Sequence, residues 1–180
     1  GLGIMSQFPV VDGEVLTDLP RAAIGAGAGR GIPLLAGWNA DEFRFFLVAY
    51  GGTDSVTEET ATAMVATEPG GPEFIRQRLA AGASAVDALC EALTAHAFSV
   101  PTAAIAASRP DSPTFLYEFG YQSPQAGIRA GHAVEIPFVF DHLAGAEPLV
   151  GPAPEQRIAD DMHERWVRFA TTGHPGWSAH

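Results

Sequence analysis

The sequence has 180 residues, of which 47% are hydrophobic and 17% charged; this composition is typical of one globular domain with a substantial core, not of a disordered chain. The formal net charge of −11 argues against nucleic acid or an anionic membrane as a partner, because phosphates would be repelled. No apolar run reaches the roughly 18 residues that a membrane span needs. Cys90 is the single cysteine, which excludes an intrachain disulfide and a cysteine-based metal cage.

The first 31 residues are rich in loops. Residues 8–13 (FPVVDG) form a short extended piece that ends in an Asp12-Gly13 turn. Pro20 begins a weak helical stretch, which the glycines of residues 25–31 end. That glycine-rich run lacks a following Lys-Ser/Thr and a preceding strand, so it does not predict a phosphate-binding loop. Because the first residue is Gly1, we expect a processed chain, an engineered piece or a fragment of a longer one.

Residues 32–37 (IPLLAG) are a short apolar run bounded by glycine, which predicts a buried parallel strand. Asn39, Asp41 and Glu42 follow it. Functional groups collect at the carboxyl ends of strands in open α/β sheets, so we expect a site here. The apolar side chains that come next should form core or pocket wall; they are Phe43, Phe45, Phe46, Leu47 and Tyr50.

Four helices are predicted between residues 55 and 110. Ser55 and Glu58 have the spacing of a capping box, and Ser84 with Asp87 forms a second cap. Pro101 is expected to begin a separate helix of small residues. The predicted helices span residues 56–67, 72–79, 84–96 and 102–108.

The last third of the chain predicts a strand, a loop with a histidine and a long helix. Residues 114–121 (TFLYEFGY) are aromatic and β-branched. His132 follows in GHAVEIPFVF, residues 131–140, where a rigid flank around Pro137 suits a general base. The final helix should begin after Pro154 and end at Gly173. One face of it is apolar, with Ile158, Met162, Trp166 and Phe169.

The two stretches IPLLAGWNADEF (residues 32–43) and GHAVEIPFVF (residues 131–140) resemble the type-B carboxylesterase and cholinesterase family. Residues 169–175 (FATTGHP) and the tail 176–180 (GWSAH) are similar to its C-terminal helix and tail. The resemblance runs over nearly the whole chain but covers only the C-terminal part of the family's fold. It implies an α/β-hydrolase fold, mostly parallel strands flanked by helices, with residues 1–180 as the C-terminal part of one domain.

The resemblance also implies a catalytic triad in the chain order Ser, acid, His. Glu42 falls on the family's acidic position and His132 on its base. A serine hydroxyl is a poor nucleophile until an imidazole takes its proton, and a carboxylate orients that imidazole. No G-x-S-x-G is present; Ser84 in GASAV comes closest but is interpreted as a helix cap. The serine and the oxyanion donors are therefore expected from outside this chain.

The remaining polar and aromatic residues near these motifs have more ordinary interpretations. Asp41 is the neighbouring alternative to Glu42 as the acidic residue and is interpreted as structural. Glu135 is also interpreted as structural, with its carboxylate bonded to backbone or to an arginine. Trp38, Phe43 and Phe46 are expected to line the substrate pocket, and Phe43 stands where many family members have glycine. The six histidines form no metal set, so neither a metal nor another cofactor is expected.

The expected partners are a small-molecule carboxylic ester and the N-terminal part of the same enzyme. A partial fold leaves sheet edges and apolar faces uncovered, so a second copy of the chain is the other expected occupant, in a homo-oligomer. The alternative function is a non-catalytic, cholinesterase-like interaction module or an inactive fragment. The presence of both Glu42 and His132 speaks against that alternative.

Overall fold

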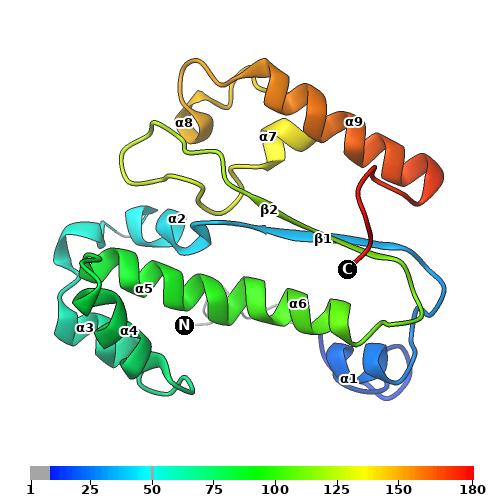
Figure 1. Ribbon diagram of the computed structural model, residues 1–180, viewed down its shortest axis with the longest axis horizontal. Coiled ribbons are helices and arrows are strands. Elements are labelled where there is room, and N and C mark those ends of the chain that lie inside the picture. The colour runs from blue at the N-terminus through cyan, green and yellow to red at the C-terminus, as the bar shows by residue number, and fades with distance from the viewer. Residues whose placement is uncertain (1–8, 50) are drawn as a thin grey trace.

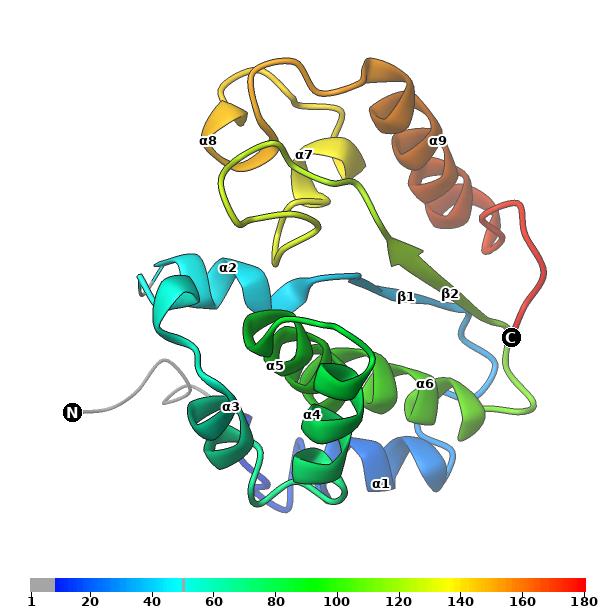
Figure 2. The same ribbon diagram turned by 60° about the vertical axis from the view of Figure 1, so that its left-hand side comes forward.

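The computed structural model describes residues 9–49 and 51–180. Two parallel strands, β1 (Leu34–Asn39) and β2 (Thr114–Phe119), lie between two groups of helices. Helices α1 and α3 to α6 lie on one side of the strands, α7, α8 and α9 lie on the other, and α2 continues from the end of β1 (Figures 1 and 2). Phe8 and Tyr50, for which the sequence predicted an extended piece and a pocket wall, lie outside the described residues.

The strand pair confirms the parallel sheet predicted from the two apolar runs. The register pairs Leu34 with Thr114 and Asn39 with Phe119. β1 starts two residues later than predicted, after Pro33, which has no N–H to give to a ladder. Gly37 is required in β1, because a Cβ there would lie 2.5 Å from the ring of Tyr117. Within the described part of the chain the sheet has two strands, so each strand keeps one unpaired edge.

The first helices are short. α1 (Pro20–Gly25) begins at Pro20 as predicted, and α2 (Glu42–Ala49) follows β1 directly. A short 3-10 turn, η1 (Thr53–Ser55), leads to α3 (Glu58–Met64). The capping box of α3 is formed by Thr57 and Thr60, so the predicted pair Ser55 and Glu58 is wrong. Ser55 Oγ donates instead to the carbonyl of Gly52 at 2.9 Å, and α3 is shorter than predicted at both ends.

After α3 the chain forms one short helix and then one long helical rod. α4 (Gly71–Ala80) precedes α5 (Ala85–Thr94), whose Ser84 cap accepts from the backbone N–H of Asp87 as predicted. A π-helical segment, η2 (Ala95–Ser99), joins α5 to α6 (Val100–Ala107) without a break. The predicted helix of small residues is therefore present as α6, but it continues from α5 and does not start separately at Pro101. The wide π turn comes just before this proline, whose ring would otherwise clash with the carbonyl one turn earlier.

The rod Ala85–Ala107 is the one helix among the described residues with the length and the mean hydropathy, 1.2, of a membrane span. Its first part contributes Ala88 and Leu89 to a buried apolar cluster with residues of α3 and α4. Asp87 and Glu91 on the same part form ion pairs with arginines. We therefore interpret the rod as a core helix.

The other side of the strands is covered by α7 (Ile136–Val139), α8 (Glu147–Val150) and α9 (Gln156–Thr172). α9 ends at Gly173 as predicted, with φ 74° and an N–H that donates to the carbonyl of Phe169 at 2.8 Å. Its apolar face meets β2, where the ring of Trp166 lies 6.2 Å from that of Tyr117. The buried cluster beneath consists of Phe119, Ile128, Val134, Phe138, Val150 and Ala159.

Candidate active site

Glu42 is held where β1 ends and α2 begins. It is the first residue of α2, and only 6% of its side chain is exposed. Its Oε1 accepts from the backbone N–H of Asn39, the last residue of β1, at 2.8 Å. Its Oε2 lies 2.6 Å from Nδ1 of His132. The tight strand-to-helix turn thus fixes one oxygen of the carboxylate and aims the other at the imidazole.

His132 lies on the loop that follows β2, at the same end of the sheet. Its backbone N–H donates to the carbonyl of Glu42 at 3.1 Å, so backbone and side chain of the two residues are joined. Gly131 precedes it in close packing, since a Cβ would lie 2.8 Å from the carbonyl of Ile128. Ala133 follows with φ 69°, in the left-handed region that non-glycine residues rarely adopt. The loop is therefore shaped around the imidazole.

The carboxylate sets the electrostatics of the histidine. The hydrogen bond to Glu42 raises the pKa of His132, partial burial opposes this, and the charges of Glu42 and Glu135 add to the rise. With Nδ1–H donating to Glu42, the other ring nitrogen, Nε2, is left as the acceptor. The ring is 43% exposed, and no hydrogen bond to Nε2 is present among residues 9–49 and 51–180. A neutral His132 can therefore accept a proton from an incoming group.

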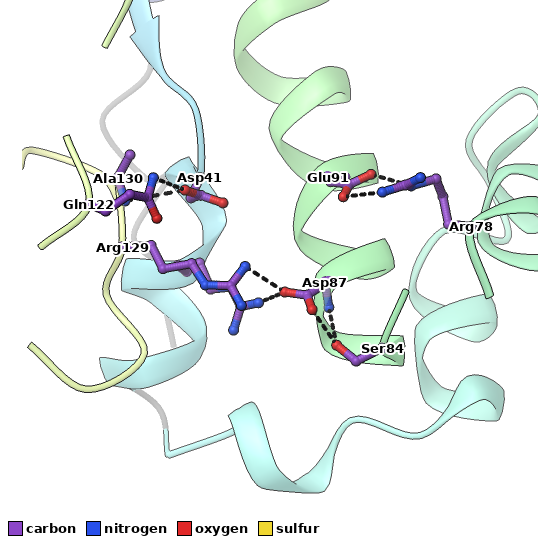
Figure 3. Close-up of polar contacts among 9 residues, drawn as sticks. Asp41, Arg78, Ser84, Asp87, Glu91, Gln122, Arg129 and Ala130 are labelled. Atoms are coloured by element: carbon purple, nitrogen blue, oxygen red, sulfur yellow. Dashed lines mark hydrogen bonds and ion pairs between the residues drawn. The ribbon is translucent and has the colours of Figure 1, made fainter. Parts of the chain in front are cut away.

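Asp41 and Glu135, interpreted from the sequence as structural, both tie the histidine loop to the end of β1. Asp41 Oδ2 accepts from the backbone N–H of Ala130 at 3.3 Å and from Nε2 of Gln122 at 3.1 Å (Figure 3). Glu135 accepts from the side-chain amide of Asn39, which also donates to the carbonyl of Gly131. The partner of Glu135 is therefore an amide and not the backbone or arginine that the sequence suggested.

Aromatic rings surround the imidazole. The ring of Phe46 lies 5.0 Å from that of His132, and the ring of Phe43 lies 5.3 Å from Phe46. The rings of Phe98 and Phe45 lie 5.5 Å and 6.3 Å from that of His132. Sequence reasoning missed Phe98, because it ended the helix near residue 96; the π-helical segment carries this ring toward the histidine.

Trp38 behaves differently from the other residues predicted to line a pocket. It lies on β1, and its Nε1 donates to Oε2 of Glu118, its register partner on β2, at 2.8 Å. In the part of the chain that the structure describes, its ring makes no stacking contact with His132. No group of three or more histidine, cysteine or acidic side chains that could hold a metal occurs among the described residues.

Comparisons with known proteins identify the family of this chain. A family model described as the carboxylesterase family matches residues 2–179. Para-nitrobenzyl esterase of Bacillus subtilis (strain 168) is 29% identical over 177 residues, which are 95% of this chain and 35% of the relative. Fumonisin B1 esterase of Sphingopyxis macrogoltabida is 32% identical over 184 residues, covering 93% of this chain and 33% of the relative. The chain thus spans about a third of the length of these relatives.

Solved structures of carboxylesterases share the fold of this chain. The carboxylesterase EST55 of Geobacillus stearothermophilus superposes with a TM-score of 0.77 at 31% identity, over 94% of this chain and 37% of that one. The juvenile hormone esterase of Manduca sexta, at 19% identity, shares the fold with a TM-score of 0.62. The predicted α/β-hydrolase fold is thereby confirmed for the part of it present here. The chain belongs to the carboxylesterase family.

Proposed function

We propose that the complete protein hydrolyses carboxylic esters through an acyl-enzyme, and that Glu42 and His132 are the acid and the base of its Ser-Glu-His triad. The observation that supports this best is the 2.6 Å contact between Glu42 Oε2 and His132 Nδ1. The side chain of Glu42 is buried, while that of His132 remains 43% exposed. One face of the pair is thus fixed by protein and the other is open to a nucleophile.

In the proposed reaction, the serine hydroxyl attacks the ester carbonyl carbon and His132 Nε2 takes the hydroxyl proton. Glu42 stabilises the imidazolium that forms. The tetrahedral intermediate collapses, the leaving alkoxide takes the proton from Nε2, and the acyl group stays on the serine. Water then attacks the acyl-enzyme with His132 again as base, which releases the carboxylic acid and restores the serine.

The serine and the oxyanion donors come from another part of the protein in this proposal. The chain contains no G-x-S-x-G. Several serines of the described part already have structural roles: Ser84 caps α5, Ser108 Oγ donates to the carbonyl of Ile105, and Ser123 Oγ donates to that of Leu149. Because relatives extend to about three times this length, we infer that residues 1–180 are the C-terminal part of one hydrolase domain.

The unpaired edges of β1 and β2 are where the rest of the sheet would add its strands. Main-chain hydrogen bonds along such an edge are satisfied by a neighbouring strand. We infer that this neighbour is the N-terminal part of the same enzyme, and that a second copy of the chain takes its place only when that part is missing. The isolated 180 residues should therefore have no esterase activity.

The test uses the complete protein, a p-nitrophenyl ester and a fluorophosphonate probe, which labels activated serines. We expect ester hydrolysis and labelling, and His132→Ala should lower kcat by roughly 10³-fold or more. His142→Ala is the control, because His142 is exposed and should leave kcat unchanged. A folded complete protein with neither hydrolysis nor labelling would instead support the interaction module.

A further inference from the structure

Asp87, on the first turn of α5, accepts two arginines with one carboxylate oxygen. Its Oδ1 pairs with the guanidinium of Arg44 and lies 2.8 Å from Nη1 of Arg129. Its Oδ2 accepts from Ser84 Oγ at 2.6 Å, so the carboxylate is held in one orientation by its own helix cap. Figure 3 shows Arg129 reaching Asp87 from the loop and Ser84 lying beside it at the start of the helix.

The two arginines come from the two elements that carry the candidate acid and base. Arg44 lies on α2, two residues after Glu42, and Arg129 lies on the loop three residues before His132. Glu42 and His132 meet directly at 2.6 Å. The side-chain pairs Glu42–His132, Arg44–Asp87 and Arg129–Asp87 therefore close a ring through α2, α5 and the histidine loop.

The positive charges of Arg44 and Arg129 make their contact depend on Asp87. Arg44 is buried, with 6% of its side chain exposed, and burial lowers its pKa; the nearby positive charge of Arg129 acts in the same direction, and the charge of Asp41 opposes it. Two guanidinium groups of like charge thus meet at one carboxylate, and without it they would repel each other. Arg129 also has φ 52° and is held by a bridge from its carbonyl to the N–H of Ser123.

Glu91, one turn further along α5, offers a contrast. Both of its oxygens accept from Arg78 of α4, at 2.5 and 2.8 Å, on the side of α5 away from the histidine loop (Figure 3). Glu91 joins two helices that carry no part of the candidate triad. Asp87 instead joins α5 to α2, which carries Glu42, and to the loop that carries His132.

We propose that Asp87 is a positioning residue, which clamps α2 and the loop of residues 129–132 to α5 through Arg44 and Arg129 and so holds Glu42 against His132. This inference rests on the proposed function, since positioning is for the triad. Asp87 touches neither His132 nor a reacting atom. Its loss should therefore change how well the pair is aligned, and hence kcat, with little effect on KM.

The experiment uses the complete protein with Asp87→Asn, Arg129→Gln, Asp87→Glu and the matched control Glu91→Gln. We expect Asp87→Asn and Arg129→Gln to lower kcat on a p-nitrophenyl ester on the order of tenfold with KM nearly unchanged. Asp87→Glu should recover part of kcat. Glu91→Gln, which also removes an ion pair from α5, should leave kcat unchanged even where it lowers Tm.

A second measurement follows His132 directly, by NMR titration of its ring in the same variants. The hydrogen bond to Glu42 is the main cause of the raised pKa of His132, with Glu135 adding to it. A loosened pair therefore predicts a lower pKa of His132 in Asp87→Asn and Arg129→Gln, and no change in Glu91→Gln. A merely structural loss of stability would lower Tm without moving this pKa.

The outcomes separate this inference from the proposed function. If the complete protein lacks esterase activity, a lowered pKa of His132 in Arg129→Gln still supports the clamp, and an unchanged one overturns it. Asp87→Asn leaves Arg44 buried without its partner and can fail to fold; Arg129→Gln then decides, because Arg129 is 45% exposed and the Arg44–Asp87 pair remains. Folded variants with unchanged kcat and an unchanged pKa of His132 would disprove the proposal.

Discussion

Two regions of this molecule are held together by different kinds of interaction. At the ends of β1 and β2, buried polar groups bind one another across long stretches of sequence: Glu42 meets His132, and Asn39 meets Gly131 and Glu135. In the helical region of α3, α4 and α5, the hydrophobic cluster consists of Ala61, Val65, Ile75, Ala88 and Leu89. The ion pair between Arg78 of α4 and Glu91 of α5 lies partly exposed at the surface of this region.

The two regions should therefore respond differently to the loss of a side chain. Removing a partner from a buried polar pair leaves an unsatisfied group in a low-dielectric site and also changes its geometry. Removing an apolar side chain leaves a cavity, which costs stability but does not redirect a proton. Changes at the strand ends should therefore act mainly on catalysis, and changes in the apolar cluster of the helical region mainly on stability. Asp87 lies on α5 but binds Arg44 and Arg129, so its substitution should act as a change at the strand ends does.

Among changes at the strand ends, Glu42→Gln in the complete protein should reduce catalysis most. An amide of the same shape keeps the packing but neither orients His132 in the same way nor stabilises its imidazolium, so kcat should fall on the order of 10³- to 10⁴-fold. Thermal unfolding should change little by comparison. An amide variant with near-normal kcat would remove Glu42 from the triad.

The pH dependence of activity gives the next test. His132 must be neutral to act as base, and its pKa is raised above the ordinary 6.5 by the bond to Glu42. The acid limb of kcat/KM should therefore have its midpoint above pH 6.5, and Glu42→Gln should move it to lower pH. Because the pKa of His132 is higher in the folded protein than in the unfolded chain, its bond to Glu42 stabilises the folded state at pH values below the unfolded-state pKa. This contribution to the free energy of unfolding is lost as the pH rises through the folded-state pKa of His132. A midpoint at or below 6.5 in the unaltered protein would contradict the raised pKa.

In the helical region, Leu89→Ala should produce the opposite result. Leu89 is fully buried in the cluster with α3 and α4, and removing its side chain should cost about 2–5 kcal/mol of stability. Val100→Ala, on the exposed face of the same rod, should change stability by less than about 0.5 kcal/mol. Urea unfolding measures both. If Leu89→Ala also shifts the pKa of His132, the apolar cluster affects the geometry of the candidate triad as well as stability.

The sequence could predict what local chemistry decides. Parallel strands, the Ser84 cap, the end of α9 at Gly173 and the strand-end placement of Glu42 all follow from patterns within a few residues. The meeting of Glu42 and His132 came only from resemblance to a family, since no local pattern brings residues 90 positions apart together. Phe98 was missed because a π-helical segment has no sequence signal as clear as a cap. The pairing of Asp87 with Arg44 and Arg129 depends likewise on tertiary packing that charge patterns alone do not specify.

The last prediction concerns the start of α3, where the sequence predicted a capping box of Ser55 and Glu58 and the structure has one of Thr57 and Thr60. Thr57 accepts from the backbone N–H of Thr60, and Thr60 Oγ1 accepts from that of Thr57, at 3.2 and 2.7 Å. Thr57→Ala should therefore cost about 1 kcal/mol of stability, seen as a lower urea midpoint at unchanged kcat. Ser55→Ala is the matched control, because Ser55 bonds only within the preceding turn and should cost less than half as much. An equal loss of stability in both variants would mean that Ser55 also stabilises the start of α3. A fall in kcat in either variant would mean that α3 affects the geometry at the strand ends.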